Sequence, residues 1–227
     1  GVDGAEFTNP DGPGRINLFS DPCVAWDCDD AISGYASGGA AIPSAYDALW
    51  NSVDNLRKYD IVFMSCTGSQ SAGRDKTTAH KQGLKDYVDS GGRAFIEHFH
   101  HAWLRGGTQD PAIEDGRKYP MTPFPPVATW ATPEDANIGG EIGAETATNY
   151  SIDTTFPKGN DFADWLVNVG ASPTRGTISL LDVKHPALSV LPVAQRWIYT
   201  DTTPVAGIGA VPFFSVNTPI EQAMTPE

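Results

Sequence analysis

The stretch that most constrains this chain is Tyr59–Leu104, in which two short apolar runs flank a helical pattern. Ile61–Met64 is a continuous apolar run of the kind that forms a strand covered on both faces, as in a parallel sheet. Lys76–Ser90 places apolar residues at helical spacing, and Gly91-Gly92 supplies a left-handed helix stop. Arg93–Ile96 starts a second buried strand. The stretch therefore predicts a strand–helix–strand unit whose two strands run parallel.

In parallel sheets, ligands bind beyond the carboxyl ends of the strands. Those ends are Ser65–Gly68 and Glu97–His101, so we expect a site where the two segments meet. The length suits one domain, residues 1–227, with ample core. The predicted fold is α/β: a flavodoxin-like parallel sheet with helices on both faces and long loops.

Further elements are expected along the rest of the chain. One helix should begin at Ser44 and carry an apolar stripe to Leu56, and another should begin at Asn160 or Asp161 and end at Gly170. Residues 105–150 lack a periodic pattern, and so long an irregular excursion is usually functional. Strands are expected at 15–19, 177–181, 196–199 and 211–216.

Charge and apolar content exclude several classes of partner. The 28 acidic and 15 basic residues give a net charge of −13, which disfavours nucleic acid and anionic membranes as partners. No apolar run reaches the ~20 residues that span a bilayer, and no signal peptide is recognisable. The acidic, lysine-poor composition favours a secreted or cell-surface location.

Three cysteines leave the redox state open. Cys23 and Cys28 flank four residues and either close a small disulfide loop or stay as free thiols, with Cys66 left over. Cys66 begins the string Cys-x-Gly-x-Gln, which ends at Gln70 and resembles a strand-to-helix nucleophile elbow. The alternative is an inert, half-buried thiol, because no glycine stands two residues before the cysteine.

Glu97, His98, His100 and His101 form the densest group of chemically active residues. On an extended backbone His98 and His100 share a face, and with a third ligand they would bind zinc. Asp60, Glu97 and His185 are the candidates for that ligand. The alternative is a histidine whose ring bonds to backbone carbonyls at a strand end. As a catalytic set we select His98, His100 and Cys66.

Two other features have a functional and a plain interpretation. The acidic run at 27–30 would suit Ca²⁺, but it lacks the length of an EF-hand loop, and a solvated loop is the alternative. Trp26, Trp103 and Trp130 would stack on sugar rings or serve as packing anchors. No phosphate-binding glycine loop and no Gly-x-Ser-x-Gly motif is present, which disfavours nucleotide binding and a serine triad.

These residues support a resemblance to a known family. Leu56, the Tyr59–Val62 run, Leu84, Tyr87-Val88 and Gly91–Arg93 together resemble the class I glutamine amidotransferase-like superfamily. Within it the chain is most similar to the trehalose-utilisation (ThuA-like) branch and to uncharacterised bacterial surface proteins. In that branch a histidine ends the strand after the double glycine, where true amidotransferases have cysteine, and His98 matches that position.

The resemblance implies further expectations. Relatives begin with a strand and helix ahead of the equivalent of Gly1 and end with a further strand, so the chain is expected to be an interior piece of a longer protein. The resemblance implies more about fold than about function, and as a function we expect a secreted or surface module without amidotransferase activity. It would bind a glycan or a protein partner through Glu97, Gln70, His101 and Trp103. The alternative is a hydrolase or carbohydrate-modifying enzyme with a histidine or metal site. No cofactor is expected beyond the zinc or calcium named above.

Overall fold

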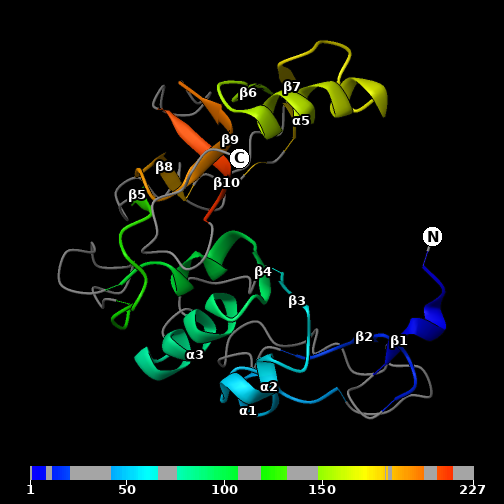
Figure 1. Ribbon diagram of the computed structural model, residues 1–227, viewed down its shortest axis with the longest axis vertical. Coiled ribbons are helices and arrows are strands. Elements are labelled where there is room, and N and C mark those ends of the chain that lie inside the picture. The colour runs from blue at the N-terminus through cyan, green and yellow to red at the C-terminus, as the bar shows by residue number, and fades with distance from the viewer. Residues whose placement is uncertain are drawn as a thin grey trace. The chain divides into compact units, whose positions relative to one another are not determined.

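The computed structural model describes residues 2–8, 12–20, 42–65, 76–106, 119–131, 148–181, 183, 186–201 and 209–216. The chain divides into two compact units, Gly1–Trp103 and Leu104–Glu227. This division leaves the single domain over residues 1–227 a prediction, since two compact units can belong to one domain. Figure 1 shows the elements of both units.

Unit 1 contains the strand–helix–strand pattern that the sequence predicts. β3 (Ile61–Met64) pairs in parallel with β4 (Arg93–Ile96), and Ile61 lies opposite Arg93. Between them α3 (Thr78–Asp89) begins with a capping box between Thr77 and His80. Gly91 has a φ of 105°, the left-handed stop that the double glycine indicates. The parallel direction of the two strands is confirmed.

The first helix of unit 1 differs from the expectation. Ser44 does cap a helix, since its side chain accepts from the backbone of Asp47, but α1 covers only Ala45–Ala48. A second helix, α2 (Val53–Leu56), begins after Ser52, whose side chain caps it in turn. The apolar stripe therefore spans two short helices. The rest of unit 1 includes the short 3₁₀ helix η1 (Gly4–Glu6) and the parallel pair β1 (Phe7–Thr8) and β2 (Ile16–Asn17).

Unit 2 is built on an antiparallel sheet of four strands in the order β10-β9-β6-β7. Its strands are β6 (Thr148–Ile152), β7 (Thr177–Leu180), β9 (Gln195–Thr200) and β10 (Ala210–Ser215). A separate antiparallel pair joins β5 (Ala128–Trp130) to β8 (Ala187–Val190). The sequence predicted β7, β9 and β10 but not β5, β6 or β8.

Helix α5 (Pro157–Asn168) lies beside β6 and β7 in Figure 1 and closes the core of unit 2. It begins earlier than expected because Pro157 stands in its first turn, where a fixed φ favours helix formation. It ends at Asn168, and Gly170, with a φ of 73°, follows as the left-handed stop. The buried residues of this core are Tyr150, Ile152, Ala163, Leu166 and Ile198.

The flavodoxin-like fold is contradicted. Within the described residues the parallel pairs are only β1–β2 and β3–β4, the largest sheet is antiparallel, and no large parallel sheet is flanked by helices. The pair β3–β4 is not covered on both faces either, since Phe63 is 74% exposed and Phe95 48% exposed. An apolar run predicts a strand, but it does not determine the direction of the neighbouring strands or whether other elements pack on both faces.

Candidate functional site

The histidine segment continues directly from β4. The amide of Glu97 donates to the Met64 carbonyl at 3.0 Å, and the 3₁₀ helix η3 (His98–Trp103) follows. The zinc hypothesis assumed an extended backbone here. The backbone forms a 3₁₀ helix instead of the extended segment that the hypothesis assumed, and Glu97 is exposed.

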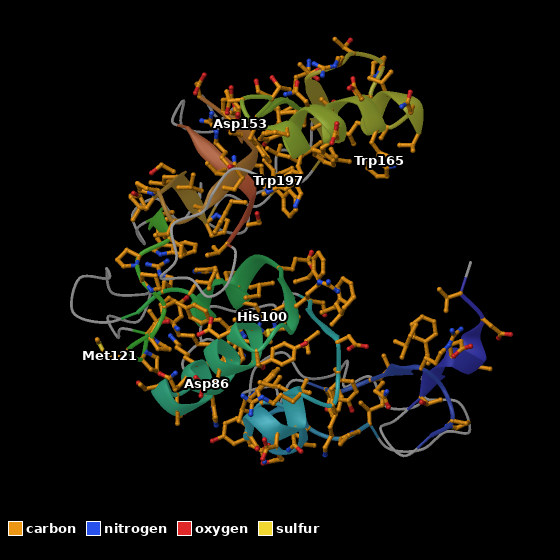
Figure 2. The ribbon with its side chains drawn as sticks, viewed as in Figure 1. Asp86, His100, Met121, Asp153, Trp165 and Trp197 are labelled. Carbon is orange, nitrogen blue, oxygen red and sulfur yellow. The ribbon has the colours of Figure 1, made fainter. Side chains whose placement is uncertain are left out.

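His100 is held inside unit 1. The Nε1–H of Trp103 donates to Nδ1 of His100 at 3.2 Å, and the ring lies edge-on to Trp50 with centroids 6.2 Å apart. Only 3% of His100 is exposed, and Figure 2 labels it among the side chains of this unit. Burial, and then the nearby charge of Lys76, lower the pKa of His100 to about 3, against a hydrogen bond with the Ser65 backbone that raises it.

His100 is therefore neutral at physiological pH. Because Nδ1 accepts from the indole, the ring proton is on Nε2. This geometry agrees with the alternative to zinc binding, in which the histidine ring bonds to backbone at a strand end. A base with this pKa and so little exposure is not placed to take a proton from a substrate in solution.

The neighbours of His100 are also core residues. Trp103 is 0% exposed and His101 is 6% exposed. The indole of Trp103 meets Trp50 edge-on at 5.5 Å, and Lys76 Nζ lies 5.0 Å from the Trp50 ring centre. A fully buried indole presents no face to a ligand in solution, so Trp103 serves here as a packing anchor.

Several sequence candidates lie outside the described residues. The side chain of His98 is not described, and neither are Cys23, Cys28, Cys66, Gln70, Trp26, His185 and the acidic run at 27–30. Among the side chains that are described, no group of three or more His, Cys, Asp and Glu is placed to hold a metal ion. The zinc and calcium sites stay predictions.

Unit 2 contains a cavity of about 440 Å³ that the sequence did not indicate. Its volume falls within the usual range of small-molecule sites. Leu188, Val190 and Val211 contribute apolar surface from β8 and β10. The polar side chains that line it are Asp153, Ser189, Gln195, Arg196, Thr200 and Asp201, joined by the ring of Tyr199.

Asp153 anchors one side of this cavity, directly after β6. Its Oδ1 accepts from the backbone and hydroxyl of Thr155 at 3.1 and 2.6 Å, and its Oδ2 accepts from Arg196 Nε at 3.0 Å. Burial by itself would raise the pKa of Asp153, but the bonds from Thr155 and Arg196 outweigh it and hold the pKa below its usual value. Asp153 is therefore a charged, almost fully buried acceptor, labelled in Figure 2.

Arg196 is fixed from two directions. Asp153 holds its Nε, and the guanidinium carbon lies 3.5 Å from the ring centre of Tyr199, a close cation–π stack. Within the described part of the chain, its Nη1 and Nη2 groups make no hydrogen bond. The side chain is 34% exposed. Arg196 thus presents pre-oriented donors at the wall of the cavity.

A second arginine in unit 2 has a packing role. Arg105 is 6% exposed, and its guanidinium carbon lies 5.1 Å from the ring centre of Tyr119 and 5.7 Å from that of Trp130. Trp130 also meets Phe214, at 6.3 Å between ring centres. Trp130, a candidate for sugar stacking, is therefore engaged by neighbours within its own unit.

Comparisons with protein-family models, with curated proteins and with solved structures found no match to this chain. The resemblance to the ThuA-like branch therefore stays a prediction, and the parallel sheet that it implies is not the sheet observed. Among the described helices, none has the length and apolar character needed to cross a bilayer.

Proposed function

We propose that the chain is a glycan-binding module and that the unit 2 cavity holds the sugar. The observation that carries the proposal is the lining of this cavity, where charged and polar side chains stand beside aliphatic ones. A sugar ring presents hydroxyl groups around its edge and C–H groups on its faces. Such a ligand needs both kinds of surface, arranged around a mostly pre-formed site.

The polar groups of the cavity are held by the fold. The Oγ of Ser189 donates to Thr129 Oγ1 at 3.0 Å, and Gln195 Nε2 donates to the Arg196 carbonyl at 2.8 Å. Asp153 and Arg196 are also bonded to each other, so many of the polar side chains that line the cavity are already oriented before a ligand binds. Pre-orientation lowers the entropy cost of binding, which favours recognition of a weakly hydrophobic ligand.

The proposal places binding in unit 2 and leaves the His100 segment a structural role, because that ring is buried and neutral. A secreted or cell-surface location fits this function, and the acidic, lysine-poor composition supports it. A disulfide between Cys23 and Cys28 would belong to the same oxidising setting. Alkylation under non-reducing conditions followed by mass measurement should then modify Cys66 alone.

A glycan array probed with the whole chain, followed by titration of the best ligand, tests the proposal. Ser189→Trp places a large ring at the cavity from an exposed position on β8, and we expect it to abolish binding. Ser179→Trp is the matched control, because Ser179 is exposed on β7 of the same unit and does not line the cavity. Absence of any glycan binding, or equal binding by the two variants, would contradict the proposal.

A further inference from the structure

We infer that the sugar bound in the unit 2 cavity is acidic, a uronic acid whose carboxylate pairs with Nη1 and Nη2 of Arg196. The inference rests on the proposed glycan-binding function and names the class of sugar. It begins from the one guanidinium that lines the cavity, which uses only the Nε donor of its five N–H groups in bonds to described residues.

The orientation of Arg196 decides which of its donors face a ligand. Nε is occupied by Asp153 Oδ2 at 3.0 Å, and stacking on Tyr199 fixes the plane of the group. The two terminal nitrogens then form a planar fork that makes no bond to any described residue. Such a fork matches the two oxygens of a carboxylate in a bidentate pair, a geometry that hydroxyl groups reproduce poorly.

The charge around the fork limits the size and charge of the ligand. Asp153 balances Arg196, so Asp201 is the remaining charged side chain of the cavity lining, and the whole chain carries −13. A doubly charged phosphate or a long polyanion would be repelled more than a single carboxylate. At physiological salt, charges beyond about 8 Å are screened, so a short uronate gains the contact with Arg196 at little long-range cost.

Asp201 also has a role in recognising the rest of the sugar. It is exposed and lines the cavity, where its carboxylate is an acceptor for ring hydroxyls. The hydroxyl of Ser189, which donates to Thr129, keeps its own lone pairs for a further donor. These acceptors would bind ring hydroxyls while the fork of Arg196 binds the carboxylate. The combination favours an acidic sugar over a peptide C-terminus, which has fewer donor groups next to its carboxylate.

The test compares galacturonate and its dimer with their methyl esters and with galactose, by titration of the whole native chain. The ester keeps the ring and removes the charge. We expect the free acid to bind at least about tenfold more tightly than the ester, because bonds between charged partners are worth more than neutral ones. This comparison needs no variant, so it does not depend on the stability of an altered protein.

Arg196→Lys then tests the fork. Lysine keeps the charge but lacks the planar pair of donors, and we expect the preference for acid over ester to fall about tenfold. Arg175→Lys is the control: Arg175 pairs with Asp164 in unit 2 away from the cavity lining, and its variant should retain the full preference. Thermal unfolding of both variants verifies that they are folded.

The outcomes separate this inference from the proposed function. If acid, ester and galactose bind equally well, the inference is wrong while glycan binding stands. If none of them binds and the glycan array is also negative, the proposed function itself fails. If a short peptide with a free C-terminal carboxylate competes as well as galacturonate does, the cavity recognises carboxylates of another class and the acidic sugar is excluded.

Discussion

Trp103 donates its indole proton to Nδ1 of His100 at 3.2 Å, between two side chains that are 0% and 3% exposed. This bond requires a neutral imidazole ring. Protonation of Nδ1 would replace an acceptor with a donor facing the indole N–H, and it would add a buried charge near Lys76. The stability of unit 1 is therefore linked to the protonation of one histidine.

The first prediction concerns acid stability. The pKa of His100 is about 3 in the folded chain and 6.5 for the free side chain, so the unfolded state binds more protons between these values. The stabilisation is complete above pH 6.5 and is lost as the pH falls towards 3. This difference between the two pKa values of His100 corresponds to a loss in the free energy of unfolding on the order of 5 kcal/mol. Hydrogen exchange of peptides from α3 and η3, measured across this pH range, should show the loss.

His100→Asn provides the control, because its amide oxygen accepts from Trp103 and does not titrate. The variant should be less stable than the native chain at pH 7, but its stability should vary less between pH 6.5 and 5, where few carboxylates titrate. A native chain whose unit 1 is equally stable at pH 7 and pH 5 would rule out the linkage.

The second prediction compares two glycines of unit 1. A Cβ on Gly92 would overlap the ring of Tyr87, whose hydroxyl donates to the Tyr59 carbonyl at 2.9 Å. Gly92→Ala should therefore destabilise the chain by about 1–3 kcal/mol through overpacking. Gly83→Ala, in α3, meets only Val53 N at 3.8 Å and should stabilise by about 0.5–1 kcal/mol. Urea unfolding measures both, and equal effects would contradict the packing described around Tyr87.

The sequence predicted most where the signal was local. The apolar run of β3, the helical spacing of α3 and the stop at Gly91 are each contained in a few residues, and all three were correct. The segment after β4 was expected to be extended, but it forms η3 because Phe99 and Trp103 both bury their rings in unit 1. Tertiary burial overrode the local pattern there.

The cavity of unit 2 had no local signal. Asp153 and Arg196 are separated by 43 positions and meet only because β6 pairs with β9. β6 has the sequence Thr-Asn-Tyr-Ser-Ile, whose polar residues hide its strand character, so its direction and its partners were not predictable. An antiparallel sheet depends on such distant pairings, whereas a strand–helix–strand unit is encoded by neighbouring segments.

The third prediction tests the open face of β3–β4. The rings of Phe63 and Phe95 stack at 4.8 Å between centres, and Phe63 is 74% exposed. Phe63→Ser should change the free energy of unfolding by less than about 0.5 kcal/mol, since it removes little buried surface. Val62→Ala, on the opposite face and 6% exposed, should cost about 1–2 kcal/mol. A large loss in Phe63→Ser would show instead that this face is covered in solution.

The last prediction concerns the ion pair at the cavity. Asp153→Asn keeps the size of the side chain but leaves Arg196 without its counter-charge and weakens the bonds from Thr155. Because the Asp153 side chain is 7% exposed and that of Arg196 34%, we expect a loss of about 2 kcal/mol, below the loss for a fully buried pair. Asp164→Asn is the matched control, since its pair with Arg175 is about half exposed on both sides and screened by solvent. Thermal unfolding near neutral pH should separate the two variants clearly.

The lowered pKa of Asp153 also means that its contribution is present above the ordinary carboxyl range and is lost as the pH falls through its folded pKa, so the difference between native chain and Asp153→Asn should shrink in acid. Equal stability of the two variants would show that the pair at the cavity is no better shielded than one on the surface.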